Sequence, residues 1–396
     1  MILTAKQNAV LDKLRCFDFK RPFFLGGYAG TGKTTILKAL ESVFPGCITF
    51  LAPTGKAGQV LKTKLSPTAT VRTIHSFLYL PVEVNEDTLD RWRKEADSGS
   101  QYAKMKLKNY EDGFTVDFKD NIKDPVSDVI VVDESSMIGQ REYTRLREVC
   151  PRLVFVGDPF QLPPVQSASV IPQDAVDFDA FLDEVHRAAL ESPITRLSMD
   201  IRSGSFRGWK YWSQQGIEYS VQTTLGTLKS VDQVITGSNA ERRRLNRLMR
   251  LPERGYDPHI GDKVIVKENI RGRNRTMRLV NGDIGRIKSV DMLSGSMDLE
   301  DLPGHFYPER LRFTDELLAE CYGVQPSFPR VGGKFRNYRV DYAYAITCHA
   351  SQGSEWPSVL VYDDHMRASD KESRLRWLYT AVTRAKEKLI FVEKSC

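Results

Sequence analysis

Residues 27–34 read G-Y-A-G-T-G-K-T, which matches the phosphate-loop pattern G-x-x-x-x-G-K-[ST]. An apolar stretch at 22–25 precedes the loop and predicts a strand, and the helix-forming segment 35–40 follows it. A loop between a strand and a helix directs backbone N–H groups and the positive end of the helix dipole at a bound phosphate. The pattern therefore predicts an α/β fold with a nucleoside triphosphate site, against the alternative of a chance glycine-rich turn.

Each position of this loop has an expected task. Gly27, Gly30 and Gly32 allow the backbone to approach phosphate oxygens where a Cβ atom would clash. We expect Lys33 to reach the β- and γ-phosphates and Thr34 to ligate Mg²⁺. ATP and Mg²⁺ are therefore the predicted cofactors.

The chain has 396 residues, 41% of them hydrophobic and 27% charged, which fits a globular protein of roughly two or three domains. Lys and Arg number 57 against 51 Asp and Glu, a mild excess that suits a phosphate-bearing partner as well as a generic basic surface. The six Cys form no C-x-x-C pair, so neither a disulfide framework nor a zinc site is expected. Without an apolar signal region or a membrane-length apolar run, we expect a soluble cytoplasmic protein with no membrane partner.

Apolar runs at 47–52, 129–132 and 153–156 are typical of buried parallel strands, each followed by small or polar residues. Ligands of open α/β sheets bind beyond the carboxyl ends of such strands. The charged stretch at about 80–126 predicts an inserted arm. Within it, an Asp-Gly turn between short strand candidates at 110–118 predicts a β-hairpin. Short β-like runs between glycines at about 258–340 predict a small barrel-like insertion, after which a second α/β pattern resumes.

Two adjacent carboxylates, Asp133 and Glu134, follow the apolar run V-I-V-V. Hydrolysis of Mg·ATP needs one carboxylate on the metal side, here Asp133, and another that orients and deprotonates the attacking water, here Glu134. The next strand end carries Gln161, whose amide is suited to sensing the γ-phosphate and the attacking water. A helix cap or a salt bridge is the alternative for such a carboxylate pair.

Three further side chains are candidates on weaker grounds. Gln7 offers an amide that could pair with an adenine edge, although a lone Gln is usually a surface residue. Arg187 and Arg384 are candidate arginine fingers, which supply positive charge to the developing phosphate oxygens. A solvated surface position is the alternative for each Arg.

The ordered set of motifs resembles the superfamily 1 helicases of the RecD/Dda-like branch, superfamily 1B. The similar segments are the Q motif at 3–7, motif I at 26–35, motif Ia at 52–57, motif Ib at 73–76, motif II at 132–136, motif III at 157–164, the motif IV arginine Arg187, motif V at 343–355 and motif VI at 379–385. Their order and spacing extend over nearly the whole chain.

The resemblance implies an α/β fold of two RecA-like P-loop domains, at 1–180 and 181–396, with ATP between them. It also implies that the arm at about 80–126 is subdomain 1B and that the insertion at about 258–340 is a small SH3-like β-barrel, subdomain 2B. The residues implied in nucleotide binding are Gln7, Gly27, Gly30, Thr31, Gly32, Lys33, Thr34, Thr35, Gly353 and Glu355. The last two match family positions near the γ-phosphate and the ribose.

In that family the motor tracks single-stranded DNA in the 5′-to-3′ direction, and second-domain arginines complete the ATP site when the two domains close. The residues in loops that face the strand in relatives are Pro53, Thr54, Lys56, Thr73, His75, Thr347, His349, Ser351 and Gln352. Short hydroxyl and imidazole donors suit phosphates without reading bases, as a sequence-tolerant translocase requires. For His75 and His349, a structural hydrogen bond is the alternative.

We therefore expect an ATP-dependent DNA helicase that acts as a monomer on single-stranded DNA and on junctions of single- and double-stranded DNA. Replication, repair or recombination proteins are its expected further partners. An RNA or RNA–DNA helicase with the same motor is an open alternative, because no loop evidently discriminates the 2′-hydroxyl. An ATP-switched protein that remodels nucleoproteins without unwinding is the alternative of a different class.

Overall fold

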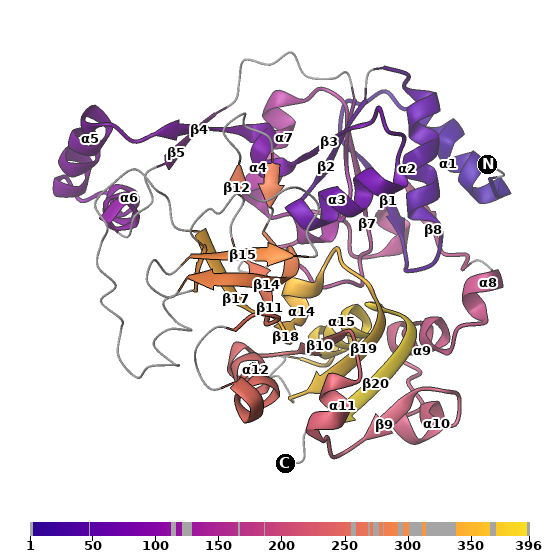
Figure 1. The fold of residues 1–396 in the computed structure, drawn as a ribbon. Coiled ribbons are helices and arrows are strands. Elements are labelled where there is room, and N and C mark those ends of the chain that lie inside the picture. Colours follow the sequence, from indigo (N-terminus) through magenta and orange to yellow (C-terminus); the bar gives the residue numbers. More distant parts are fainter. Residues whose placement is uncertain are drawn as a thin grey trace.

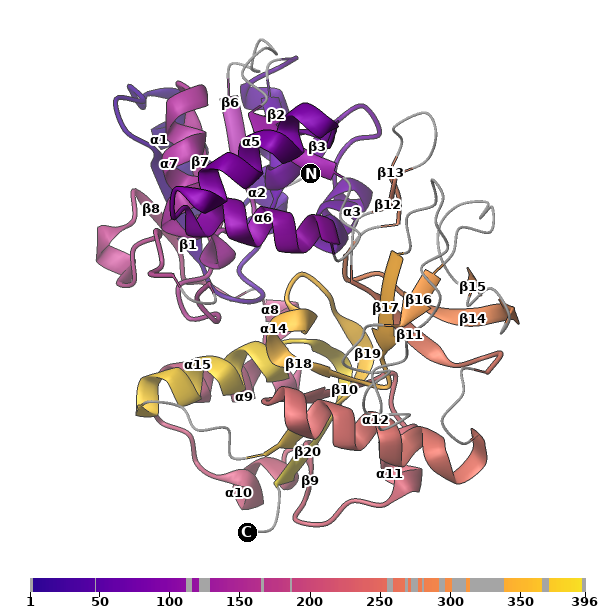
Figure 2. The same cartoon turned by 90° about the vertical axis from the view of Figure 1, so that its left-hand side faces the viewer.

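The computed structural model describes residues 3–46, 48–111, 116–120, 129–164, 167–185, 187–254, 259–267, 270–271, 277–279, 281–291, 296–300, 311–313, 338–364 and 370–393. Much of the predicted barrel therefore lies outside the described residues. Two of the sheets are parallel and carry helices on both faces (Figure 1, Figure 2).

The first sheet has the strand order β3-β2-β6-β7-β1-β8, and all neighbouring strands pair in parallel. Its strands are β1 (Phe23–Gly27), β2 (Ile48–Ala52), β3 (Thr70–Thr73), β6 (Val129–Val132), β7 (Leu153–Gly157) and β8 (Ala180–Leu182). The strands predicted from apolar runs, β1, β2, β6 and β7, are confirmed to within two residues at each end. β8 pairs with β1 and ends at Leu182, two residues beyond the predicted domain boundary.

Helices cover both faces of this sheet. One face packs against α1 (Ala5–Arg15), α2 (Lys33–Val43) and α3 (Gly55–Lys64), the other against α4 (Ile74–Leu78) and α7 (Gln140–Val149), and the short helices η1 (Ser135–Met137) and η2 (Ala175–Asp177) lie in connections. Because the strands are parallel, their carboxyl ends meet at one edge. That edge collects the phosphate loop after β1, Asp133 after β6 and Asp158 after β7.

Between α4 and β6 the chain forms a two-stranded ribbon, in which β4 (Tyr79–Glu83) pairs antiparallel with β5 (Val116–Asp120). The helices α5 (Glu86–Asp97) and α6 (Gln101–Glu111) lie at its end, away from the first sheet (Figure 1). The hairpin that we predicted from the Asp-Gly turn is wrong, because residues 101–111 are helical and β5 pairs with the distant β4. A turn dipeptide reports only local preference, and here the pairing is non-local.

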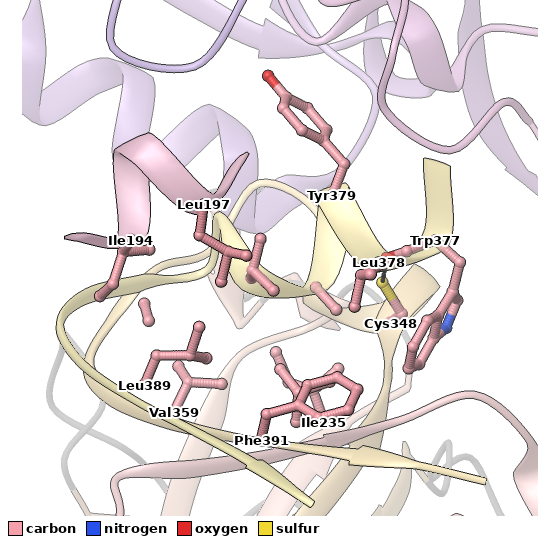
Figure 3. Packing of buried hydrophobic residues seen from close by; sticks show 14 of the residues in the cluster. Ile194, Leu197, Ile235, Cys348, Val359, Trp377, Leu378, Tyr379, Leu389 and Phe391 are labelled. Atoms are coloured by element: carbon pink, nitrogen blue, oxygen red, sulfur yellow. Dashed lines mark hydrogen bonds between the residues drawn. The ribbon is translucent and has the colours of Figure 1, made fainter. Parts of the chain in front are cut away.

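The second sheet, with the order β18-β10-β19-β20-β9, is also parallel. Its strands are β9 (Glu218–Ser220), β10 (Gln233–Thr236), β18 (Ala345–Thr347), β19 (Trp356–Asp363) and β20 (Ala385–Glu393). One face packs against α9 (Pro193–Arg202), α10 (Trp209–Ser213) and α15 (Lys371–Val382), the other against α11 (Leu225–Lys229) and α12 (Asn239–Arg254), while α8 (Arg187–Leu190) and α14 (Cys348–Ser351) are short connecting helices. Figure 3 shows the first of these cores, with Trp377, Val359 and Phe391 among its residues.

A third sheet lies between α12 and β18, where the small β insertion was predicted. Its order is β15 (Ser296–Glu300), β14 (Ile284–Asp291), β11 (Lys263–Val266), β17 (Tyr338–Tyr342) and β16 (Leu311–Phe313), and β12 (Ile270–Arg271) pairs separately with β13 (Met277–Leu279). Its closure into an SH3-like barrel stays a prediction. Among the described helices, none has the length and apolar composition that a membrane crossing requires.

Candidate nucleotide site and its contacts with the second sheet

The phosphate loop turns through two glycines in the left-handed region, Gly30 with φ 76° and Gly32 with φ 85°. Glycine is favoured there because it has no Cβ. Thr31 is buried and donates to the carbonyl of Tyr28 at 2.8 Å, which tightens the loop. Thr34 and Thr35 lie half-buried in the first turn of α2, whose free N–H groups favour an anion.

Lys33 folds back over the loop. Its Nζ donates to the carbonyl oxygens of Gly27 and Tyr28 at 2.7 and 2.9 Å. The same Nζ lies 3.9 Å from Oδ2 of Asp158, in the connection after β7. The ammonium group is thus held within the loop itself, where a phosphate could replace the carbonyl contacts.

Asp133 and Glu134 meet at the end of β6, as the sequence predicted for adjacent carboxylates. Loss of water on burial, with the neighbouring negative charge of Glu134 second, raises the pKa of Asp133 to about 7, while the Lys33 charge acts in the opposite direction. Glu134 adopts a φ of 50°, which is uncommon and strained for a residue with a side chain. A bound cation would favour the ionised form of Asp133.

Buried polar atoms without hydrogen-bond partners gather at this sheet edge, within the described part of the chain. They are Oγ of Ser135 and Ser136 after β6 and Oε1 of Gln161 after β7. In α1, Oε1 of Gln7 accepts from the backbone N of Thr4 at 3.0 Å, but its Nε2 is buried without a partner. Unpaired buried polar atoms are costly, so a donor on Gln7 and an acceptor on Gln161 fit an adenine and a water.

The second half of the chain reaches the phosphate loop through Tyr379 of α15, which points away from its own core toward the first sheet (Figure 3). Its hydroxyl donates to Oδ2 of Asp158 at 2.7 Å and accepts from the backbone N of Ala29 at 2.9 Å. Burial, followed by the charge of Asp158, raises the pKa of Tyr379 well above its usual value, so the phenol stays neutral. One side chain therefore joins both loops of the first half to the second half.

Further contacts hold the connection after β7 against the second half. The N–H of Leu162 donates to Oγ1 of Thr380 at 3.0 Å, and Nε2 of Gln352 donates to the carbonyl of Leu162 at 3.1 Å. Arg376 donates to the carbonyl of Pro159. These partners lie between 190 and 218 residues apart in the chain, so no local pattern could have revealed them.

The structure describes the side chain of only one predicted arginine finger, Arg384. Arg384 is 4% exposed, and its Nε donates to the carbonyl of Thr380 at 2.9 Å, so it is held within the second half. The side chain of Arg187 lies outside the described part, but its helix α8 lies against the phosphate loop. A Cβ on Gly30 would be 3.5 Å from Cβ of Ala189. Their contact with a phosphate stays a prediction.

Gly353 and Glu355, predicted near the nucleotide, contact other groups. Gly353 has a φ of 74°, and a Cβ there would lie 2.8 Å from Cβ of Ala57 in α3. This position is therefore a close approach between the two halves. Glu355 is exposed, with its carboxylate 3.6 Å from Nζ of Lys386.

Three of the predicted strand-facing residues cap helices. Oγ1 of Thr54 accepts from Ala57 N at 3.1 Å, Oγ1 of Thr73 from Ser76 N at 3.1 Å, and Oγ1 of Thr347 from Ala350 N at 3.3 Å. Sequence reasoning missed this N-capping role, although Thr before a helix is a known signal for it. Their DNA contacts stay predictions.

The other predicted DNA contacts are divided between exposed and buried positions. Lys56 lies 3.8 Å from Oδ1 of Asp283 in the third sheet's segment, and the neighbouring Pro53 is half-buried. His75 is exposed beside Tyr79, with ring centroids 5.0 Å apart.

Motif V contributes the buried members of this set. His349 is half-buried, and burial lowers its pKa. Ser351 is fully buried and donates to the carbonyl of Cys348 at 2.7 Å, while Gln352 is 5% exposed and holds Leu162. A strand contact by these two side chains would need them to give up these bonds.

Similarity to known proteins covers both halves. The family model described as AAA domain matches residues 3–219, and the model described as UvrD-like helicase C-terminal domain matches residues 342–392. The ATP-dependent RecD2 DNA helicase of Deinococcus radiodurans is 25% identical over 98% of this chain and 48% of its own length. The chain spans less than half the length of the curated relatives that it matches.

Solved structures share the fold across nearly the full chain. A structure of two coordinating Pif1 helicases at forked double-stranded DNA gives a TM-score of 0.58 at 17% identity, with 99% of this chain and 92% of that chain covered. The Bacteroides Pif1 bound to single-stranded DNA gives 0.55 at 16% identity, with the same coverage.

Proposed function

Because the chain belongs to the AAA-domain family and to the superfamily 1B helicases, we propose that it is an ATP-driven DNA helicase. In this proposal the chain translocates 5′-to-3′ on single-stranded DNA and unwinds duplex at a junction. Residues 1–180 and 181–396 act as two RecA-like motor domains, with a 1B arm at about 80–126 and a 2B barrel at about 258–340.

The observation that carries this proposal is the bond pair of Tyr379. A hydroxyl from the second half accepts from Ala29 N of the phosphate loop at 2.9 Å and donates to Asp158 at 2.7 Å. Binding of a triphosphate in the loop would therefore change contacts that the second half makes through Tyr379. A motor whose two halves bind DNA alternately needs such a contact. ATP can shift the balance between the open and closed arrangements only if it interacts differently with each of them.

Each predicted site residue has a role in this motor. Lys33 binds the β- and γ-phosphates, Glu134 orients and deprotonates water, and Gln161 senses the γ-phosphate. Thr34 and Asp133 would hold Mg²⁺, which neutralises charge on the phosphates. The arginines Arg187 and Arg384 enter when the halves close, and Gln7 with its unpartnered Nε2 binds the adenine.

Relatives support DNA as the polymer. They include a RecD2 DNA helicase and Pif1 helicases bound to single-stranded DNA, to forked double-stranded DNA, and to ADP-AlF3 with single-stranded DNA. The proposed DNA track is formed by the strand-facing residues of motifs Ia, Ib and V. Their contacts would be to phosphates, so the motor would tolerate any sequence.

Lys33→Ala tests the motor assignment. Without the ammonium group, phosphate binding is lost, so we expect ATP turnover and unwinding to fall below detection while single-stranded DNA binding persists. Lys38→Ala is the matched control, because Lys38 is exposed on the same helix. The measurement is strand displacement on duplexes with 5′ or 3′ tails of DNA or RNA, with Mg²⁺ and ATP.

Unwinding by Lys33→Ala would contradict the motor assignment. Displacement only from 3′ tails would contradict the polarity, and a preference for RNA tails would favour the RNA helicase instead. ATP turnover without displacement of any duplex would favour the remodelling switch.

A further inference from the structure

Arg202 is a cation of the second half that lies on the phosphate loop. It is the last residue of α9, and its guanidinium carbon lies 3.4 Å from the ring centroid of Tyr28. Tyr28 is the second residue of the loop pattern, next to Ala29, whose N–H bonds Tyr379. Cation–π contacts extend to about 6 Å, so the guanidinium lies close over the ring of Tyr28.

The stacked guanidinium is not satisfied as a hydrogen-bond donor. Its Nε is buried and has no partner in the described part of the chain. The groups that act on it electrostatically are the carboxylate of Asp183, which is paired with Lys6, and the hydroxyl of Tyr379. Neither forms a hydrogen bond with Arg202, so this half-buried guanidinium has no hydrogen-bonded anion among the described residues.

We propose that Arg202 is a further arginine of the nucleotide site, which binds the terminal phosphate of the bound triphosphate. Tyr28 supports the flat face of the guanidinium, and this leaves the edge N–H groups free for phosphate oxygens. Lys33 approaches the phosphates from inside the loop, whereas Arg202 approaches from the second half. The inference deepens the proposed function and rests on it.

The test compares Arg202→Ala and Arg202→Lys with Arg196→Ala, a matched control on the same helix, where Arg196 is exposed. We would measure kcat and KM for ATP with saturating single-stranded DNA, and Kd for ADP and for a non-hydrolysable ATP analogue. A lost charge-assisted contact predicts a fall of about 10- to 100-fold in kcat/KM for Arg202→Ala. Affinity for the ATP analogue should fall about as much, while affinity for ADP stays near wild type.

Arg202→Lys should lie between wild type and Arg202→Ala, since it keeps the charge and loses the planar fork. Arg196→Ala should match wild type in every measurement. If Arg202→Ala loses melting temperature but keeps the wild-type ratio of ATP-analogue to ADP affinity, Arg202 only packs against Tyr28 and the inference is overturned. A wild-type protein without ATP turnover would instead overturn the proposed function.

Discussion

Asp133, which we propose as a Mg²⁺ ligand, lowers the stability of the folded protein when it is ionised. It is half-buried beside Glu134, and its pKa is raised to about 7 because burial removes water from the charged form and Glu134 adds a second negative charge. Above that pH the ligand-free protein holds two neighbouring carboxylates, whose charge Lys33 and Lys64 offset only in part. A metal-bound triphosphate would reverse this balance, so the destabilisation would be relieved when nucleotide and metal bind.

Asp133→Asn should therefore stabilise the metal-free, nucleotide-free protein. The folded protein disfavours the ionised form of Asp133, which raises its pKa to about 7. The resulting loss of unfolding free energy is therefore complete above about pH 7 and becomes smaller as the pH falls toward 4. We expect the gain in free energy of unfolding at pH 8 to exceed that at pH 5.5 by on the order of 2 kcal/mol.

Denaturant unfolding in EDTA at the two pH values measures this gain. Asp174→Asn, at an exposed position, is the control and should show no pH-dependent gain. An equal or larger gain for Asp133→Asn at pH 5.5 would contradict the explanation.

At the scale of elements, short sequence patterns predicted the strands whose formation depends on their own apolar residues. The strands β1, β2, β6 and β7 are continuous apolar runs buried on both faces, which is a signal that a short window contains. The phosphate loop and the Asp133–Glu134 pair follow from such strands. The helices α5 and α6 were not predicted, because their stretch is highly charged and its Asp-Gly dipeptide favoured a turn.

Contacts between distant elements could not be predicted in the same way. Tyr379 and Thr380 lie in a segment that resembles a helicase motif, but nothing in the sequence indicates that they bond Asp158 and Leu162. Likewise, the stack of Arg202 on Tyr28 joins residues far apart in the chain. Which residues meet across the contact between the halves depends on how the two sheets and their helices pack together. A short pattern of residues does not contain that information.

Gly353→Ala tests one such contact between elements. A Cβ there meets Cβ of Ala57 at 2.8 Å and Cα of Ala57 at 3.2 Å, at a φ of 74°. Gly204→Ala is the control, because Gly204 has a similar φ of 71° with nothing within 4 Å. Both variants bear the left-handed penalty of about 1–2 kcal/mol, and only Gly353→Ala adds the clash.

We expect Gly353→Ala to lose at least about 1 kcal/mol more unfolding free energy than Gly204→Ala, measured by denaturant unfolding without ligand. Equal losses would mean that α3 and the loop after α14 separate freely. In that case the close approach would not contribute to holding the two halves together.

At the scale of the whole molecule, two of the places where the halves touch lie among the described residues and involve functional motifs. One is the phosphate loop with the connection after β7, bonded by Tyr379, Thr380 and Gln352. The other is α3, where Lys56 lies 3.8 Å from the carboxylate of Asp283. The proposed motor would need these contacts to be strong enough to define one closed arrangement and weak enough to open. Loss of a single hydrogen bond across the interface should therefore affect closure more than loss of one within either half.

Tyr379→Phe examines this difference directly. It leaves Ala29 N–H and one carboxylate oxygen of Asp158 without their partner in a buried place, which should cost about 1–3 kcal/mol. Tyr219→Phe is the matched control, since its hydroxyl donates to Glu393 at 2.8 Å within the second half alone. We expect Tyr379→Phe to raise the radius of gyration in solution scattering and to expose the halves to proteolysis, because they separate more often. Tyr219→Phe should leave both unchanged.

Identical scattering and proteolysis for the two variants would show that the hydrogen bonds of the Tyr379 hydroxyl do not hold the halves together. Closure of the halves would then depend on the Leu162 and Lys56 contacts instead.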